Sequence, residues 1–279
     1  MEDVTEPTVD LDAYFSRVGY QGGRAPTLET LETIIARHTE ALPFENLNPL
    51  LRWPVRLDPA SLEEKMVRGG RGGYCFEQNL LLKSVLNALG YRVTGLAARV
   101  LWNAPEGAIT PRTHMVLRVD IGERPFIVDV GFGGLTLTGV LRLEPATEQP
   151  TPHEPFRLVR AGDDFIMQAN VGKLWKPLCC FALQPQFLPD YEVTNWYLCN
   201  HPNSRFIHGL IASRPAQDRR YTLHNNEFAV HHLGGKTERR ILSTVAEVRE
   251  ALQDVFRLTL PRAPELDVAL DRLIFEAAN

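Results

Sequence analysis

The chain has 279 residues, of which 44% are hydrophobic and 23% charged; this is the composition of a globular protein and excludes a disordered or fibrous chain. Its 30 Lys and Arg residues and 34 Asp and Glu residues give a formal net charge of −4. Such a charge gives no electrostatic case for nucleic acid or an anionic membrane as the main partner.

The cysteine content and the lack of long apolar runs indicate the cellular compartment of the protein. The chain has 4 cysteines, and they form neither a CxxC pair nor a disulfide framework. No run of about 18 apolar residues is present, and the acidic start MEDVTEPTVDLD lacks the features of a secretory signal. We therefore expect a soluble, cytoplasmic protein in a reducing environment.

Residues 1 to about 90 have the periodicity of helices. Asp10 and Thr27 are N-cap residues, each followed by an apolar stripe with 3.6-residue spacing. Asp58-Pro59 combines an N-cap with proline at the first helical position, so it predicts a third helix. A fourth helix is expected to begin near Tyr74 or Cys75.

From about residue 91 the pattern changes to that of strands. We expect strands over 114–121 and 126–130, joined by a turn at 122–125, with further short strands over 140–143, 156–159 and 164–168. This spacing predicts an antiparallel sheet or small barrel. The last part is mixed: a capping box at Thr244 opens one helix, and another follows Pro264.

The segment RGGRGGYCFEQN, residues 68–79, places a cysteine at the start of a helix directly after four glycines. Glycine allows another backbone or a ligand to approach closely. The N-terminus of a helix favours a thiolate, so we expect the thiol pKa of Cys75 to lie below its usual value, with Arg68 and Arg71 adding to this if they point inward. The alternative is that Cys75 is a small buried apolar residue.

A nucleophilic thiol needs a base, and the base needs an orienting acid. His114 begins the first predicted strand, 39 residues after Cys75. Asp129 lies 15 residues further on, among the apolar residues of the second predicted strand. A carboxylate is out of place there unless it is paired. A hairpin would put His114 and Asp129 on neighbouring strands. Each residue alone suits a structural role, but their coincidence favours a Cys-His-Asp triad.

The turn Gly131-Phe-Gly-Gly134 follows a strand but is not a dinucleotide-binding loop. Thr136 stands where GxGxxG needs its third glycine, and no helical pattern follows. A backbone nest for a phosphate or an acyl carrier, and a plain tight turn, both remain open interpretations. His153-Glu154 lacks the second histidine of HExxH, so no metal site is expected.

Four motifs together resemble the arylamine N-acetyltransferase family, most closely its bacterial, actinobacterial-type members. They are Pro43-Phe-Glu-Asn-Leu47, Arg71-Gly-Gly-Tyr-Cys-Phe-Glu-Gln-Asn79, Thr113-His114 and Val128-Asp-Val-Gly-Phe-Gly-Gly134. The resemblance implies an α+β fold with a papain- or transglutaminase-like core. Its three parts would be a helical bundle over 1–90, a β-barrel over 91–200, and an α/β lid with a C-terminal helix over 201–279.

The resemblance also implies chemistry and partners. Cys75, His114 and Asp129 would be catalytic, forming an S-acetyl-cysteine intermediate in a ping-pong reaction, with no metal. The acyl donor would be acetyl-CoA, and the acceptor a small aromatic amine or hydrazine, as in xenobiotic metabolism. We expect a monomer or weak homo-oligomer without nucleic acid or membrane partners. Residues that match the family's coenzyme A site are Thr113, Gly131, Phe132, Gly133, Phe206 and His231.

Two other functions are compatible with the same residues. One is a thiol hydrolase of the papain or transglutaminase kind, which has the same Cys-His-Asp order. The other is a catalytically silent module that binds acyl-CoA. The intact triad positions favour an enzyme over the silent module.

Overall fold

The structure, a computed structural model, describes residues 9–278, so the N-terminal stretch expected to lack a secretory signal begins outside the described residues. The predicted helix starts in the N-terminal part are confirmed. Asp10 Oδ1 accepts a hydrogen bond from the backbone N–H of Ala13, and Thr27 Oγ1 accepts one from Thr30. The helical elements of this part are α1 (Leu11–Val18), α2 (Leu28–Ala41), α3 (Leu47–Leu50), α4 (Pro59–Leu62), the π-helical turn Glu63–Arg68, and α5 (Cys75–Ala88).

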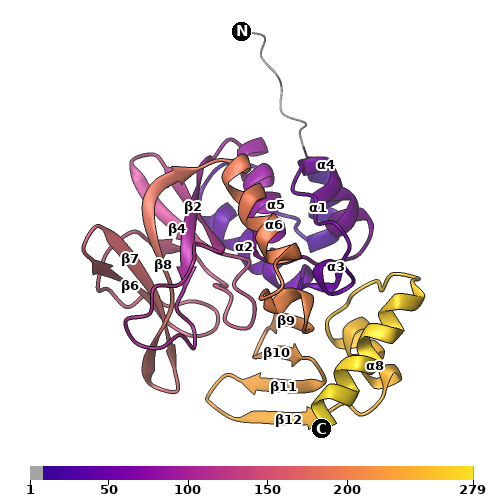
Figure 1. The fold of residues 1–279 in the computed structure, drawn as a ribbon. Coiled ribbons are helices and arrows are strands. Elements are labelled where there is room, and N and C mark those ends of the chain that lie inside the picture. Colours follow the sequence, from indigo (N-terminus) through magenta and orange to yellow (C-terminus); the bar gives the residue numbers. More distant parts are fainter. Residues whose placement is uncertain (1–8, 279) are drawn as a thin grey trace.

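Seven antiparallel strands form the central part, in the order β5-β4-β3-β2-β8-β7-β6. Isolated bridges from Pro145 and Gln149, just after β5, to Leu158 and Phe156 on β6 nearly close this sheet into the expected barrel (Figure 1). The strands are β2 (Arg92–Val100), β3 (His114–Ile121), β4 (Arg124–Val128), β5 (Leu141–Arg142), β6 (Phe156–Ala161), β7 (Asp164–Val171) and β8 (Leu174–Gln186).

The hairpin of β3 and β4 is confirmed, but its second strand was predicted with the wrong bounds. The strand begins at Arg124 and ends at Val128, whereas 126–130 was expected. Asp129 is therefore the first residue beyond the strand. Its carboxylate accepts a hydrogen bond from the backbone N–H of Gly131, which turns the chain away from the sheet. Val128 and Val130 on either side of Asp129 continue the strand pattern, so this turn could not be recognised from the pattern alone.

A second sheet of five strands, in the order β1-β9-β10-β11-β12, lies below α6 and beside α8 in Figure 1. Its edge strand β1 (Phe44–Glu45) comes from the N-terminal part and pairs with β9. This pairing joins the first and last parts of the chain. The other strands are β9 (Ile211–Ala216), β10 (Arg219–His224), β11 (Glu227–His232) and β12 (Thr237–Ile241).

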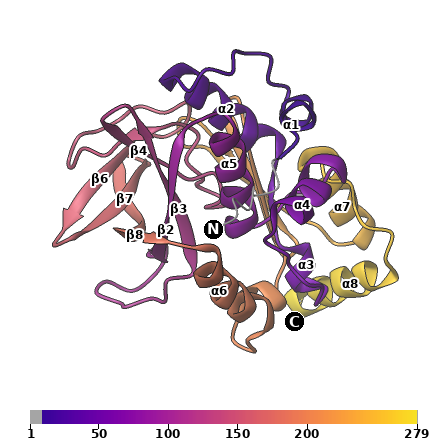
Figure 2. The same ribbon diagram turned by 90° about the horizontal axis from the view of Figure 1, so that it is seen from above.

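The remaining helices connect and cover these sheets. Helix α6 (Leu188–Asn200) follows the barrel, and α7 (Val245–Glu250) and α8 (Pro264–Ala278) share a hydrophobic cluster with α3 (Figure 2). The capping box at Thr244 and the final helix are confirmed. Two short helical turns complete the fold, Arg205–Ile207 and Ala251–Val255. Among residues 9–278, none of the helices has the length and apolarity needed to cross a membrane.

Candidate active site

Cys75 is the first residue of α5, and its side chain is buried, with 3% of the residue exposed. The helix start is fixed by Glu77, whose Oε2 accepts a hydrogen bond of 3.0 Å from the backbone N–H of Tyr74. The Cys75 Sγ lies 3.7 Å from the carbonyl oxygen of Thr113. This contact places the thiol directly beside the start of β3.

His114 and Asp129 form a close buried pair. His114 Nε2 lies 2.6 Å from Asp129 Oδ2, and both side chains are shielded from solvent. The β3–β4 hairpin brings them together, as the sequence predicted. Because Nε2 is engaged by the carboxylate, Nδ1 is the ring nitrogen left to exchange a proton with another group.

Asn79 joins two of the predicted residues, Cys75 and Asp129, although no role was predicted for it. Its Nδ2 donates to the carbonyl oxygens of Cys75 and Met115, at 3.2 and 3.0 Å, and to Asp129 Oδ1 at 3.1 Å. Its Oδ1 accepts from the backbone N–H of Val130. Asn79 therefore ties α5 to β3 and to the loop that follows β4. The signal that could have found it was its spacing, because it lies one helical turn after Cys75.

Gly72 and Gly73, just before α5, lie too close to their neighbours for a larger residue to fit. An ideal Cβ on Gly72 would lie 2.0 Å from the carbonyl oxygen of Pro43, and one on Gly73 would lie 2.7 Å from Glu77 Cβ. The backbone N–H of Gly73 donates to the Pro43 carbonyl at 3.3 Å. The predicted close approach is thus made by the chain itself, at the segment that leads into β1.

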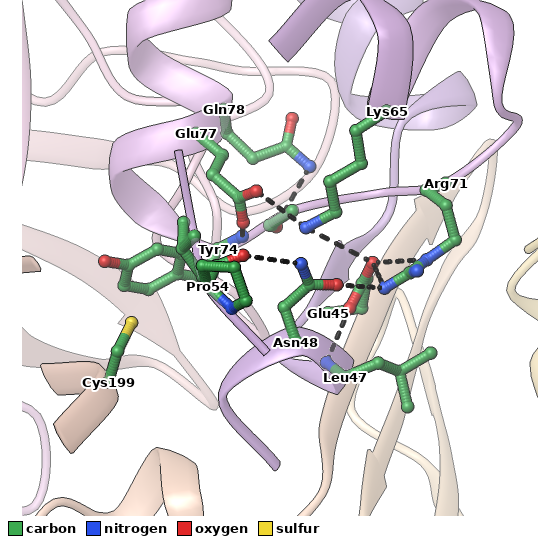
Figure 3. A network of polar contacts seen from close by, with 12 residues as sticks. Glu45, Leu47, Asn48, Pro54, Lys65, Arg71, Tyr74, Glu77, Gln78 and Cys199 are labelled. Carbon is green, nitrogen blue, oxygen red and sulfur yellow. Dashed lines mark hydrogen bonds and ion pairs between the residues drawn. The ribbon is translucent and has the colours of Figure 1, made fainter. Parts of the chain in front are cut away.

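A network of buried charged side chains contacts this loop (Figure 3). Lys65 Nζ lies 2.6 Å from Glu77 Oε1 and 3.7 Å from Glu45 Oε1, and Arg71 Nη2 lies 2.7 Å from the same Glu45 oxygen. Arg68 is half exposed at the surface, where it pairs with Asp10 and Glu63. Both arginines are thus engaged by carboxylates, and the expectation that they would assist the Cys75 thiolate is wrong.

The expected direction of the thiol pKa is also wrong. Burial raises the pKa of the Cys75 thiol above its usual value, and the negative charge of Asp129 raises it further. The hydrogen bond from the backbone N–H of Phe76 lowers this pKa, as expected at a helix start, but it does not outweigh burial. A lone thiolate is therefore unfavourable at this position, and the charged form needs a cation beside it.

The loop after Asp129 lies against the catalytic candidates. The Phe132 ring meets the His114 ring edge-on, with the centroids 5.3 Å apart. Gly133 has a φ of 91°, in the left-handed region that favours glycine. A Cβ on Gly133 would lie 3.7 Å from the hydroxyl oxygen of Ser213, which is buried and has no hydrogen-bond partner in the described part of the chain. This places β9 of the second sheet beside the loop.

The two remaining coenzyme A candidates lie in the C-terminal part. Phe206 is buried, and its ring centroid lies 5.6 Å from that of Tyr74, the residue before Cys75. His231 lies on β11, where its ring nitrogens contact the hydroxyls of Thr222 and Thr237 at 3.0 and 3.1 Å. Phe206 therefore packs against the residue that precedes Cys75, whereas the ring nitrogens of His231 contact hydroxyl groups within the second sheet.

One trio of side chains in the described part of the chain has the spacing of metal ligands. His114, Asp129 and Cys179 offer ligand atoms that all lie within 4.8 Å of one another, and all three residues are buried. Cys179 lies in the barrel core, whereas its neighbour Cys180 is half buried, because adjacent side chains of a strand point to opposite faces. His114 Nε2 is already bonded to Asp129, so the pair is satisfied without an ion.

Comparison with known proteins identifies relatives over nearly the whole chain. A family model described as N-acetyltransferase matches residues 27–265. An arylamine N-acetyltransferase of Mycobacterium bovis is 42% identical over 273 residues, which is 95% of this chain and 96% of that protein. One from Escherichia coli is 40% identical over 249 residues, or 89% and 88% of the two chains.

Solved structures agree with these relatives. The arylamine N-acetyltransferase of M. tuberculosis superposes with a TM-score of 0.91 at 42% identity, covering 94% of this chain and all of that one. That of Mycobacterium marinum in complex with CoA gives 0.91 at 40% identity, covering 95% and 99%. The predicted α+β architecture is thereby confirmed.

Proposed function

The chain belongs to the arylamine N-acetyltransferase family, and from this premise we propose that Cys75 carries an acetyl group from acetyl-CoA to an aromatic amine or hydrazine. The observation that carries the proposal is the buried His114–Asp129 pair, 2.6 Å apart, beside a cysteine at a helix start. The family resemblance supports the donor and the acceptor class, and the geometry supports the roles of the three residues.

In the first half-reaction, His114 Nδ1 takes the proton of the Cys75 thiol. The thiolate attacks the carbonyl carbon of the acetyl thioester, the bond from that carbon to the CoA sulfur breaks, and the departing thiolate takes the proton from His114. The products are S-acetyl-Cys75 and CoA. One thioester replaces another, so this step is close to thermoneutral.

In the second half-reaction, the neutral acceptor nitrogen attacks the acetyl group on Cys75. The acceptor loses one proton to His114, the carbon–sulfur bond to Cys75 breaks, and His114 returns the proton to the Cys75 sulfur. Aromatic amines and hydrazines are weak bases, so at pH 7 they keep the free electron pair that this step needs. An alkylamine is largely protonated at that pH.

The raised thiol pKa defines what His114 and Asp129 must do. Burial disfavours a lone thiolate, but a thiolate beside an imidazolium is an ion pair with no net charge. Asp129 then holds the imidazolium through Nε2, so the proton exchanges at Nδ1. Backbone N–H groups at the start of α5 are suited to stabilise the tetrahedral oxyanion, which contributes about 3–4 kcal/mol in comparable sites.

Aromatic side chains around the triad support an aromatic acceptor. Phe132 contacts His114 edge-on, and the rings of Phe44 and Phe206 lie 6.4 Å apart on the side of the second sheet. The unpartnered hydroxyl of Ser213 gives this region a free hydrogen-bond donor and acceptor. Coenzyme A contacts at Thr113, Gly131, Phe132, Gly133, Phe206 and His231 stay part of the proposal.

Mass spectrometry after incubation with acetyl-CoA alone tests the proposal directly. We expect the protein to gain the mass of one acetyl group, on the peptide that contains Cys75. Cys75→Ser should lose the adduct, and Cys180→Ser, at the half-buried thiol of the barrel, should keep it. With both substrates present, parallel initial-rate plots are expected for a ping-pong scheme. An unmodified protein that still turns over, or intersecting plots, would remove the covalent intermediate.

A further inference from the structure

An open hollow of about 600 Å³ lies in the segment between α7 and α8, outside the site described above. Arg249, Arg257 and Arg262 line it, together with Gln253 and Thr259. The two ribbon views place α8 on the side of the molecule away from the barrel, which carries His114 and Asp129 (Figure 1, Figure 2).

The positive charge at this hollow is only partly neutralised. Arg249 Nη1 lies 2.6 Å from Asp267 Oδ1. In the described part of the chain, neither Arg257 nor Arg262 has a carboxylate within ion-pair distance. Three guanidinium groups around one hollow with one carboxylate leave a net positive field, and a concave surface concentrates such a field.

Two further arginines lie behind Arg257. Arg17, in the last turn of α1, donates through Nε to the carbonyl oxygen of Met66, but its Nη2 is buried and has no hydrogen-bond partner among residues 9–278. Arg214 is 5% exposed and donates to the carbonyl oxygens of Val255 and Glu40. Hydrogen bonds to neutral carbonyl oxygens leave the charge of both guanidinium groups in place.

The charge of Arg257 acts on both buried arginines. Burial lowers the pKa of Arg17 and of Arg214, and the positive charge of Arg257 lowers both further. Arg257 itself has a φ of 58°, a conformation that side chains other than Gly, Asn and Asp rarely adopt. Like charges gathered in a strained segment destabilise the empty protein, which is typical of a site shaped for a ligand.

We propose that this arginine hollow is a binding site for a small phosphorylated anion, separate from the acetyl-transfer site. The planar guanidinium fork pairs with two phosphate oxygens at once, so arginines suit a phosphomonoester or a diphosphate. Thr259 adds a hydroxyl group to the lining. A bound anion supplies the counter-charge that Arg257 and Arg262 lack and reduces the repulsion felt by Arg17 and Arg214.

Thermal unfolding in low-salt, phosphate-free buffer tests the site, with pyrophosphate and inorganic phosphate as probes. We expect pyrophosphate to raise the Tm of the wild-type protein in a saturable manner, because a ligand that binds only the folded state stabilises it. Arg257→Asn removes the charge and tolerates the left-handed backbone. This variant should bind pyrophosphate at least tenfold more weakly by calorimetry, and Arg262→Gln should show the same direction of change.

Two comparisons separate binding from general effects. Arg124→Ala removes one exposed arginine of the barrel hairpin and should keep the full pyrophosphate response. Without anion, Arg257→Asn should unfold at the wild-type Tm or above, since it relieves repulsion, whereas loss of an arginine that only supports the fold would lower the Tm.

Three results would overturn the proposal. One is an equal pyrophosphate response in the wild-type protein, Arg257→Asn and Arg262→Gln, which would indicate a general salt effect. Another is a lowered Tm for Arg257→Asn without anion. The third is a raised KM of Arg257→Asn for acetyl-CoA with unchanged pyrophosphate affinity, because the hollow would then belong to the donor site.

Discussion

Gly131 is the point where the loop that follows Asp129 crosses the start of the nucleophile's helix. An ideal Cβ at this position would lie 2.7 Å from Cys75 Cα and 2.8 Å from both the Cys75 carbonyl oxygen and Asn79 Nδ2. Two of these atoms are helix backbone, and the third belongs to the Asn79 side chain, which is held by hydrogen bonds to α5, to β3 and to the loop after β4. Gly131→Ala must therefore separate the loop from α5 by roughly half an ångström or more, because carbon atoms pack at about 3.5–4.0 Å.

That separation should affect both stability and activity. Inserting a methyl group into a packed interior costs about 1–3 kcal/mol of unfolding free energy. The backbone N–H of Gly131 donates to Asp129 Oδ1 at 3.0 Å, so a displaced loop also moves the carboxylate that holds His114. A misplacement of about 1 Å can cost about 100-fold in rate. We expect Gly131→Ala to reduce kcat/KM by about 10- to 100-fold.

Gly134 provides a matched control in the same loop. A Cβ there meets only Thr222 Cγ2, at 3.4 Å, which is an ordinary contact. Urea unfolding and initial rates of acetyl transfer should be measured on both alanine variants. We expect Gly134→Ala to resemble the wild-type protein. If Gly131→Ala keeps wild-type stability and rate, or if both variants lose equally, the argument from close packing at Cys75 is wrong.

Three further predictions concern the titratable groups. Asp129→Asn should leave the fold intact and abolish most acetyl transfer, because the amide cannot hold an imidazolium; full activity would remove Asp129 from the triad. Alkylation of Cys75 by iodoacetamide, followed against pH, should proceed near pH 7 in the wild-type protein. In His114→Gln it should require strongly alkaline solution, because burial then raises the thiol pKa with no cation to offset it; similar profiles would rule out the ion pair. Burial lowers the pKa of His38 to about 4, and its Nε2 contacts Gln78. Its unfolded pKa is higher, so stability should fall as the pH drops from 6.5 toward 4, with about 2 kcal/mol lost between pH 7 and pH 5. Urea unfolding should show a smaller loss for His38→Gln.

Local signals explain how much of the fold could be predicted. The caps at Asp10, Thr27 and Thr244 each place a side-chain oxygen on a free N–H of a helix, and the sequence shows such a residue directly before an apolar stripe. Cys75 and Asp129 could be singled out as candidates because Cys75 follows a glycine run and Asp129 is a carboxylate in an apolar segment. Each of these features is visible within a few consecutive residues of the sequence, so it can be recognised without knowing the fold.

The parts that were not predicted depend on contacts between distant segments. Helix α6 has almost no amphipathic pattern, since Val193 and Trp196 are exposed beside residues that are buried. Strand β1 is two residues long and exists because Phe44 pairs with Ser213, 169 positions away by the numbering. Asn79 looks like an ordinary polar residue of a helix until the hairpin is folded against it. No local pattern carries such information.

The thiol pKa shows how a correct local rule can give the wrong result. A helix start does favour the Cys75 thiolate, and the Phe76 N–H acts in that direction. Burial, however, is a property of the whole fold: the barrel, α5 and the loop at Gly131 leave the thiol 3% exposed. Under the proposed mechanism, Cys75 is therefore activated by His114 rather than by its helix. We expect loss of His114 or Asp129 to abolish the reactivity of Cys75 even though the helix start remains unchanged.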